Sequence, residues 1–209
     1  MRKDIVALLP LRGGSKGIPK KNIKHFNNFP LFYWSAKAVL DSNIKLYIST
    51  EDIEIEGEVN KYLENAIILK RPKSLAEDIS STESVISHFI ENVNANDILL
   101  IQATSPLTQK KNILEAIDMF YKNGRKSLVS GTRQHLFFWS DDGNSLNYDP
   151  INRPRRQDWN GTFVENGALY IFSKFSFLNS GSRCLANSTL YEMSNIHSID
   201  IDTIAEWNQ

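Results

Sequence analysis

Short apolar runs alternate with segments of helical periodicity along most of this chain, and no other feature restricts its fold so strongly. The apolar runs are typical of buried strands, and the segments between them repeat apolar residues every three or four positions, as amphipathic helices do. Strands and helices in alternation predict a mainly parallel sheet with helices on both faces. We therefore expect an α/β fold of three layers, in which ligands bind beyond the carboxyl ends of the strands.

The same periodicity gives the boundaries of the expected elements. We expect strands at Asp4–Pro10, Lys45–Ser49, Ala66–Leu69, Asp97–Gln102, Ser127–Gly131, Gly167–Phe172 and Ser198–Ile201. We expect helices at Pro30–Ser42, Ile53–Glu64, Ser81 or Thr82 to Val93, Lys110–Lys122 and Lys174–Leu178, and a last stub of helix ending at Gln209. Thr82 is the candidate N-cap of the helix that it opens.

Residues 133–162 break this alternation inside what we otherwise expect to be a single domain over residues 1–209. Aromatic residues such as Trp139 and Trp159 are mixed there with turn-forming residues, which indicates a β-hairpin in an inserted arm. The arm also carries a basic cluster of Arg153, Arg155 and Arg156. Because exposed aromatic side chains would promote aggregation of a monomer, we expect the arm to be a surface for self-association, and the protein to be a homodimer.

Composition excludes several other classes of protein. The 24 basic and 24 acidic side chains give no net charge, and therefore no long-range basic field for nucleic acid or an anionic membrane. No apolar run approaches the roughly 18 residues that a membrane-spanning helix needs. The single cysteine, Cys184, and the lack of a secretory leader after Met1 predict a cytoplasmic protein.

The segment from Leu11 to Asn22, LRGGSKGIPKKN, follows the first expected strand and predicts an anion site. Its glycines allow backbone N–H groups to approach a phosphate chain closely, and its cations can offset the roughly four negative charges of a nucleoside triphosphate. The spacing matches neither the P-loop nor the dinucleotide fingerprint. The alternative interpretation is a solvated basic turn without a ligand.

Asp200 and Asp202 lie two residues apart in the last expected strand, so that both carboxylates would face the same side. Paired carboxylates suit Mg²⁺, a hard cation that takes one or two of them while phosphate and water complete its coordination. The alternative is structural, because Asp202 is also placed to cap a helix that starts near Thr203.

Several ordered motifs together resemble the acylneuraminate cytidylyltransferase family, which activates sialic acid and related nine-carbon 2-keto sugars. The motifs are RGGSKGIPKKN (12–22), STED (49–52), RPKSLAEDISST (71–82), LLIQATSPL (99–107), RRQ (155–157), ENGALYIF (165–172) and IDIDT (199–203). The resemblance covers nearly the whole chain. It implies a Rossmann-like nucleotidyltransferase of the glycosyltransferase-A type, a three-layer sandwich with a mainly parallel sheet and a β-hairpin dimerisation arm.

The resemblance also implies roles for individual residues. The nucleotide-binding residues would be Arg12, Gly13, Ser15, Lys16, Lys21, Asn22, Arg71, Ser81 and Thr82, with Asn22 on the cytosine and the last three around the base and ribose. The sugar-binding residues would be Gln102, Arg156 and Tyr170, the Mg²⁺ ligands Asp200 and Asp202, and the catalytic residues Arg12, Lys21 and Asp202. In the family the arm reaches across a dimer, so Arg155 or Arg156 would serve the partner's site.

Some of these residues also have purely structural interpretations. Arg71 taken alone is more typical of a solvated or helix-docking arginine, and Tyr170 of a core tyrosine. Asp78 is a candidate for ordering its loop or capping the next helix. Val164 stands where the family commonly has an arginine, which leaves one cation missing unless Arg153 or Arg155 replaces it or the preferred sugar differs.

The implied reaction is transfer of CMP from CTP to the anomeric hydroxyl of a nonulosonic acid of the sialic, legionaminic or pseudaminic type, with release of pyrophosphate. Catalysis would come from in-line positioning and charge neutralisation, with Mg²⁺ as the cofactor and Asp202 or a metal-bound water as the base. Two alternatives stay open. One is a pyrophosphorylase for another sugar acid or a sugar 1-phosphate, and the other is a catalytically silent nucleotide-binding module.

Overall fold

The computed structural model describes residues 5–208 and contains a seven-stranded sheet in the order β5-β4-β1-β6-β8-β7-β9. Asp4 and Gln209, which the expected first strand and last helix included, lie outside the described residues. The strands are β1 (Ile5–Pro10), β4 (Lys45–Thr50), β5 (Ala66–Lys70), β6 (Asp97–Ile101), β7 (Ser127–Gln134), β8 (Thr162–Ser173) and β9 (Thr189–Glu192).

The sheet is mainly parallel, as the alternating pattern predicts. β1 pairs in parallel with β4 and β6, β4 with β5, and β7 with β9. β8 runs antiparallel to both of its neighbours, β6 and β7, and places Ser173 opposite Asp97. The carboxyl ends of β1, β4, β5 and β6 therefore meet at one edge of the sheet.

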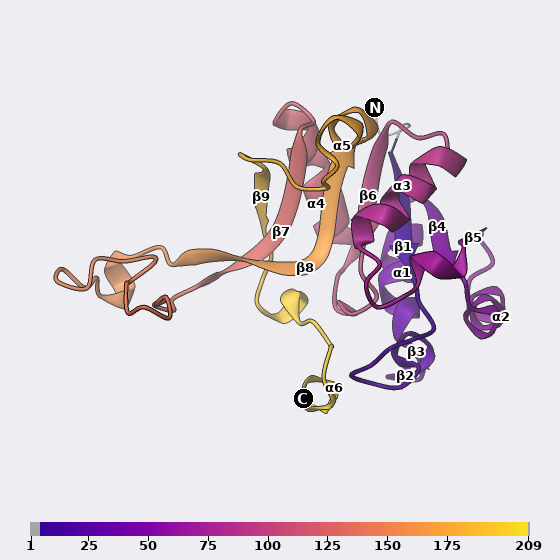
Figure 1. Ribbon diagram of the computed structural model, residues 1–209, viewed down its shortest axis with the longest axis horizontal. Coiled ribbons are helices and arrows are strands. Elements are labelled where there is room, and N and C mark those ends of the chain that lie inside the picture. Colours follow the sequence, from indigo (N-terminus) through magenta and orange to yellow (C-terminus); the bar gives the residue numbers. More distant parts are fainter. Residues whose placement is uncertain (1–4, 209) are drawn as a thin grey trace.

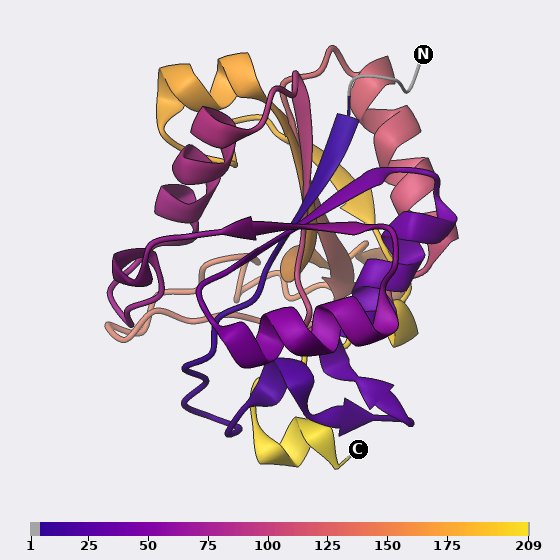
Figure 2. The ribbon, with the colours of Figure 1, turned by 90° about the vertical axis from the view of Figure 1, so that its right-hand side faces the viewer.

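Helices cover both faces of the sheet and make it the middle of three layers (Figure 2). One face is covered by α1 (Leu31–Asp41), α2 (Ile53–Tyr62) and α4 (Lys110–Lys122), and the other by α3 (Thr82–Asn92) and α5 (Lys174–Ser180). Phe120 of α4 and Phe89 of α3 are buried in the two halves of the core. No helix within residues 5–208 is long and apolar enough to cross a membrane.

The prediction of a strand at Ser198–Ile201 is wrong, and β9 is the edge strand of the sheet next to β7. The segment instead contains a short 3-10 helix at Ile196–Ser198 followed by irregular backbone. The N–H of Ile201 donates to the carbonyl of Thr104, which belongs to a loop and not to a strand. The apolar alternation there reflects burial of Ile201 beside Ile18 and not pairing in a sheet.

The structure differs from the expectation at one helix cap and contains a small hairpin that was not predicted. Ser81, and not Thr82, caps α3, because its Oγ accepts a hydrogen bond from the N–H of Ser84 at 3.1 Å. The hairpin consists of β2 (His25–Phe26) and β3 (Phe29–Pro30). The asparagines between them adopt the positive φ angles that such turns require and that asparagine tolerates.

The arm between β7 and β8 projects away from the sheet (Figure 1). It contains the short hairpin that the turn residues predict, with an antiparallel bridge between Trp139 and Ser145. Phe137 stacks on Trp159 with ring centroids 5.0 Å apart, and the guanidinium of Arg153 lies 4.2 Å from the Phe137 ring centroid. Several large apolar side chains of the arm stay exposed, namely Leu136, Trp139, Leu146 and Ile151.

Candidate active site

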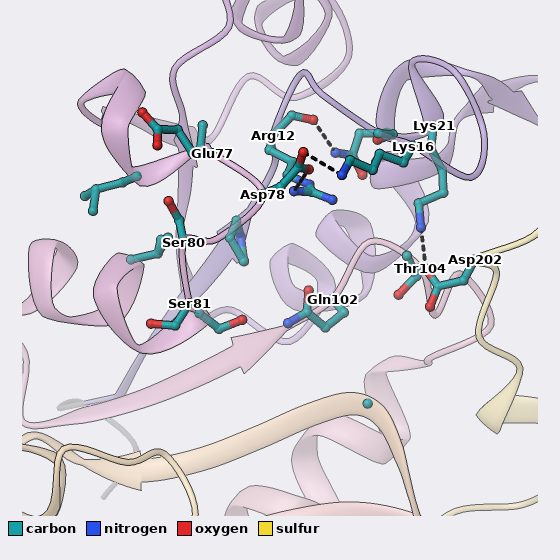
Figure 3. Close-up of a pocket in the computed structure, with 18 of the residues that line it drawn as sticks. Arg12, Lys16, Lys21, Glu77, Asp78, Ser80, Ser81, Gln102, Thr104 and Asp202 are labelled. Carbon is teal, nitrogen blue, oxygen red and sulfur yellow. Dashed lines mark hydrogen bonds and ion pairs between the residues drawn. The ribbon is translucent and has the colours of Figure 1, made fainter.

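A cleft of about 670 Å³ opens at the carboxyl ends of the parallel strands, where the alternating pattern predicts a ligand site (Figure 3). Most of the predicted site residues line it, although they come from segments far apart in the sequence. These are Arg12, Ser15, Lys16, Lys21, Asn22, Arg71, Ser81, Thr82, Gln102, Tyr170, Asp200 and Asp202. Two predicted residues, Gly13 and Arg156, are not part of this lining.

The loop after β1 is held to the protein along its length. The N–H of Leu11 donates to the carbonyl of Ser49 at its start, and Ile18 is buried in its middle. At its end, the side chain of Asn22 donates from Nδ2 to the carbonyl of Arg12 at 2.9 Å. These contacts hold the loop in one conformation, whereas a merely solvated turn would not be anchored in this way.

Two glycines of this loop are required by close contacts with other segments. A Cβ at Gly13 would lie 2.0 Å from Oδ2 of Asp52, and a Cβ at Gly17 would lie 2.5 Å from the backbone carbonyl oxygen of Asp202. The N–H of Gly13 donates to Oε1 of Glu51 at 2.8 Å. Gly13 therefore serves the shape of the loop, and its N–H is directed at a carboxylate of this chain.

Asp78 lies opposite the loop and pairs with two of its cations (Figure 3). One carboxylate oxygen lies 2.7 Å from Nζ of Lys16 and the other lies 3.3 Å from Nη1 of Arg12. The hydrogen bond from Lys16, and then the charges of Lys16 and Arg12, hold the pKa of Asp78 below its usual value. Asp78 therefore orders its loop, as one sequence interpretation proposed, and Ser81 is the residue that caps α3.

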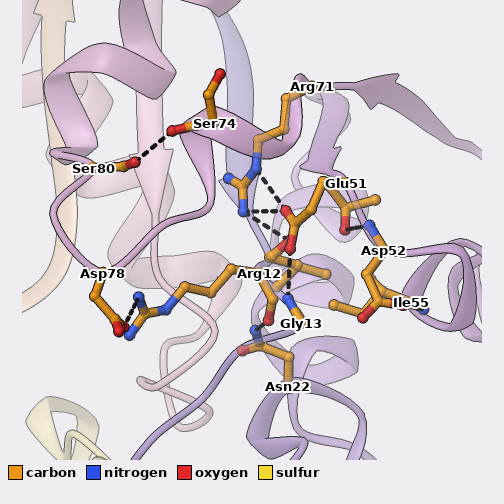
Figure 4. Close-up of polar contacts among 12 residues, drawn as sticks. Arg12, Gly13, Asn22, Glu51, Asp52, Ile55, Arg71, Ser74, Asp78 and Ser80 are labelled. Carbon is orange, nitrogen blue, oxygen red and sulfur yellow. Dashed lines mark hydrogen bonds and ion pairs between the residues drawn. The ribbon is translucent and has the colours of Figure 1, made fainter.

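Arg71 is neither solvated nor docked on a helix. Its side chain is only 3% exposed, and its guanidinium pairs with Glu51 through Nε at 2.8 Å and Nη2 at 2.7 Å (Figure 4). Nη2 also donates to the carbonyl of Leu11 at 3.2 Å. These contacts fix the plane of the guanidinium where it borders the cleft.

Asp200 and Asp202 both line the cleft although no strand carries them. The burial of Ile201 between them turns the two neighbouring side chains toward the cleft. Nζ of Lys21 lies 2.5 Å from Oδ1 of Asp202. The cap of α6 (Ile204–Trp207) is Thr203, which forms a capping box with Glu206, so the alternative role of Asp202 as a cap is excluded.

The donor set at these aspartates fits a divalent cation. Oδ1 of Asp200 is buried and has no hydrogen-bond partner among the described residues. Burial raises the pKa of Asp200, and the charge of Asp202 raises it further while a hydrogen bond from Thr104 opposes the shift. A cation beside the pair would relieve both effects. Residues 5–208 contain no cluster of three or more His, Cys, Asp or Glu side chains arranged to hold a metal, so phosphate and water oxygens would complete the coordination.

Gln102 and Tyr170 also line the cleft. Gln102 follows β6 directly, and its N–H donates to the carbonyl of Ala168. Tyr170 is a core residue of β8 whose hydroxyl donates to Glu165, and burial followed by this hydrogen bond raises its pKa. The guanidinium of Arg183 covers its ring at 4.7 Å. Tyr170 therefore has the structural role that the sequence allowed and borders the cleft as well.

A second cavity of about 380 Å³ adjoins the cleft and shares Gly167 and Asp200 with it. Its other lining residues are Thr132, Gln134, Val164, Glu165, Asn166 and Ser198, so the described chain supplies no lysine or arginine to it. The two arginines considered as substitutes for the missing cation do not reach it. Arg153 packs on the arm aromatics, and Arg155 pairs with Asp158 at 2.6 Å.

Two residues that shape this site were not predicted from the sequence. Glu51 lies in the STED motif without an assigned role, although an acidic residue directly after a central strand was a usable signal. Thr104 had no assigned role either, although it lines the cleft and its carbonyl accepts a hydrogen bond from the N–H of Ile201. No local pattern marks Thr104, because its contact joins loops almost a hundred positions apart in the sequence.

Comparison with known proteins gives consistent matches over nearly the whole chain. A family model described as cytidylyltransferase matches residues 6–203. N-acylneuraminate cytidylyltransferase A of Danio rerio is 37% identical over 215 residues, covering 98% of this chain and 49% of the relative, so the chain spans about half the length of that protein. Pseudaminic acid cytidylyltransferase of Campylobacter jejuni is 28% identical over 214 residues, covering 96% of this chain and 92% of the relative.

A solved structure has the same fold. It is the CMP:2-keto-3-deoxy-manno-octonic acid synthetase complexed with CTP, with a TM-score of 0.69 over 96% of this chain and 94% of the other. At 13% sequence identity this likeness concerns the fold alone. It confirms the expected Rossmann-like nucleotidyltransferase architecture.

Proposed function

The chain belongs to the cytidylyltransferase family, and from this premise and the geometry of its cleft we propose that it transfers CMP from CTP to the anomeric hydroxyl of a nonulosonic acid. Pyrophosphate is the leaving group. The observation that carries the proposal is the convergence of four cations on one cleft of about 670 Å³, at the end of the sheet where such folds bind nucleotides. The cations are Arg12, Lys16, Lys21 and Arg71. Four carboxylates line the same cleft, those of Glu77, Asp78, Asp200 and Asp202, and the last two are the pair proposed for the metal.

The nucleotide occupies the half of the cleft formed by the loop after β1 and the segment 71–82. Arg12 and Lys16 exchange Asp78 for the β- and γ-phosphates, which carry more charge than one carboxylate. Lys21 contacts Asp202 rather than Asp78, and it neutralises charge on the leaving pyrophosphate. Asn22, Arg71, Ser81 and Thr82 surround the base and ribose.

The sugar acid occupies the half formed by Gln102, Tyr170 and the adjoining second cavity. Gln102 offers one amide donor and one acceptor for hydroxyl groups, and the second cavity is lined by further amide and hydroxyl side chains. Asp200 and Gly167 border both cavities, so their junction is where the anomeric hydroxyl meets the α-phosphate. Alignment of these two groups accounts for much of the rate acceleration.

Asp200 and Asp202 hold Mg²⁺ in this proposal, and the fit rests on the buried, unpartnered oxygen of Asp200. When bound, Mg²⁺ neutralises the charge that develops on the phosphate oxygens. Asp202 accepts the proton of the attacking hydroxyl, since its carboxylate is the more exposed of the two and lies beside Lys21. The contact with Lys21 holds the carboxylate of Asp202 in place at the cleft.

The carboxylate of the sugar acid requires a cation, and the second cavity of this chain has none among the described residues. Arg156 lies exposed on the projecting arm, away from the cleft of its own chain. We propose that the arm packs against a second copy and brings Arg156 to the partner's sugar site, where it binds the carboxylate bidentately. The exposed apolar residues of the arm would be buried in the same contact.

The test is Mg²⁺-dependent pyrophosphate release from CTP with nine-carbon and eight-carbon 2-keto sugar acids supplied one at a time, and with the nucleotide product identified by mass. The proposal expects a CMP-sugar from at least one nine-carbon acid. A silent nucleotide-binding module would bind CTP and release no pyrophosphate with any acid. A pyrophosphorylase for sugar 1-phosphates would instead release pyrophosphate only with those compounds.

A further inference from the structure

Beyond the residues assigned above, we infer that Glu51 is a positioning residue, which sets the guanidinium of Arg71 and the start of the phosphate loop in one fixed arrangement. The inference rests on the proposed function, because it concerns how the nucleotide half of the cleft is held. Glu51 itself is not among the residues that line the cleft. It acts through its two neighbours, which are Arg71 and Gly13.

The order of the strands places Glu51 between the two groups that it joins. β4 lies between β5 and β1 in the sheet, and Glu51 follows β4 directly. Arg71 follows β5, and Gly13 lies three residues after the end of β1. Backbone hydrogen bonds continue past the strand ends. The N–H of Leu11 donates to the carbonyl of Ser49, and the N–H of Arg71 donates to the carbonyl of Thr50. Glu51 therefore stands at the middle of three adjacent loops.

Both carboxylate oxygens of Glu51 are occupied (Figure 4). Oε1 accepts from the N–H of Gly13 at 2.8 Å, and Oε2 accepts from Nε and Nη2 of Arg71 at 2.8 and 2.7 Å. The side chains are 11% and 3% exposed respectively for Glu51 and Arg71. Because water is largely excluded, the pair is only weakly screened and its geometry is restrictive.

Each contact has a consequence for nucleotide binding. Without Glu51 the charge of Arg71 would be buried and unpaired, and the guanidinium would turn toward water or toward the ligand in several orientations. The N–H of Gly13 would also lose its acceptor, which frees the loop that carries Arg12 and Lys16. Glu51 thus restricts both the base-binding and phosphate-binding groups before CTP arrives.

The test compares Glu51→Gln with a matched control, Glu54→Gln. Glutamine keeps the size of the side chain and one acceptor, but its amide group meets the N–H groups of Arg71 with donors and carries no charge. Glu54 is also paired with a loop cation, Lys20 at 2.6 Å, but that pair is half-exposed and lies outside the cleft. The same chemical change is therefore made at a pair that is not expected to matter.

We expect Glu51→Gln to raise the KM for CTP about 10- to 30-fold, to leave kcat within about threefold, and to leave the KM for the sugar acid unchanged. Discrimination between CTP and UTP should fall as well, because Arg71 borders the base. The control should change none of these values by more than about twofold. A general loss of structure would lower kcat and change both KM values together.

A second comparison tests whether Glu51 acts through Arg71. In an Arg71→Ala background the additional Glu51→Gln change should raise the KM for CTP by no more than about threefold, because the partner is already gone. An increase as large as that in the wild-type background would overturn the role proposed for the pair.

Calorimetric binding of CTP, which needs no turnover, separates this inference from the proposed function. If the wild-type chain binds CTP and Glu51→Gln binds it equally well, the inference is wrong and the proposed function stands. If the wild-type chain binds no CTP, the proposed function fails and the inference fails with it. Weakened CTP binding by Glu51→Gln with retained folding, measured by thermal unfolding, is the supporting result.

Discussion

The two halves of the cleft differ in how far a single chain completes them. In the nucleotide half each cation is paired with a carboxylate of the same chain, as in Lys21 with Asp202 and Arg71 with Glu51. In the sugar half the lining is amide, hydroxyl and carboxylate, with no basic side chain from the described residues at the second cavity. The described chain therefore supplies cations suited to a polyphosphate in the first half and no cation to the second cavity.

This difference shows how a chain with no net charge can still prepare an anion site. The cations of the nucleotide half come from two short segments and are held by acids that fix their positions without adding net charge. Preorganised pairs of this kind avoid the cost of ordering flexible side chains when the ligand binds. In the proposed sugar half the arrangement is the opposite, because the cation that we propose for the sugar carboxylate, Arg156, belongs to the arm, and the arm projects from the body (Figure 1).

The largest expected effect concerns the junction between the two halves. Asp200→Asn with Asp202→Asn should lower kcat about 10³-fold or more while thermal unfolding shows a folded protein, because both proposed metal ligands lose their charge. The measurement is pyrophosphate release at saturating CTP and sugar acid. Asp41→Asn, at an exposed pair with Lys37 on α1, is the matched control. Full activity of the double variant would remove the metal assignment.

A smaller effect is expected within the nucleotide half. Lys21→Met should lower kcat/KM for CTP about 10²-fold, because the side chain is only 13% exposed and faces the leaving group in the proposed mechanism. Steady-state kinetics with CTP varied is the measurement. Lys37→Met is the control, since its ammonium group pairs outside the cleft. Equal kinetics for both variants would show that Lys21 serves only to pair with Asp202.

The sugar half should respond differently to loss of a cation. Arg156→Ala should raise the KM for the sugar acid about 10- to 30-fold and leave calorimetric CTP binding unchanged. Arg155→Ala is the comparison, because Arg155 is already held by Asp158 at 2.6 Å. If Arg155→Ala has the larger effect, Arg155 and not Arg156 binds the sugar carboxylate. If neither variant changes this KM, the arm does not bind the sugar carboxylate.

The smallest effect is expected where an acid competes with the substrate. Asp78→Asn should tighten CTP binding by about two- to threefold, because it releases Lys16 and Arg12 from an exposed carboxylate. Calorimetry at two ionic strengths measures this, and the gain should shrink at higher salt because the groups are exposed. Weaker binding of CTP by Asp78→Asn would mean that Asp78 helps binding by ordering the loop more than it hinders binding by competing with the phosphates for Lys16 and Arg12.

The sequence predicted the sheet, its helices and the place of the cleft, because each of these depends on local periodicity and on the rule that parallel strands share one ligand-binding edge. It failed at Ser198–Ile201, where Ile201 is buried by loop contacts that mimic the apolar alternation of a strand. The spacing of Asp200 and Asp202 still brought both to the cleft, since alternating burial turns the neighbours of a buried residue outward.

Individual contacts were harder to predict than positions. Arg71 was expected to contact a ligand directly, and the structure adds the carboxylate that holds it, twenty residues earlier in the chain. Gly13 was expected at the nucleotide, which stays a prediction, and the structure adds that a Cβ there would lie 2.0 Å from Oδ2 of Asp52. Such facts depend on which loops pack together, and no local pattern of the sequence encodes that packing.

In the proposed dimer, the nucleotide half belongs to one chain and the sugar half is completed by the arm of the other. The most direct test is to co-express the Asp202→Asn and Arg156→Ala variants with different tags and to isolate the mixed dimer through both tags. One of its two sites then has both residues intact, so the account predicts about half of the wild-type pyrophosphate release at sugar acid concentrations below the wild-type KM. Activity no higher than that of Arg156→Ala alone, or failure of the two chains to associate, would contradict the claim.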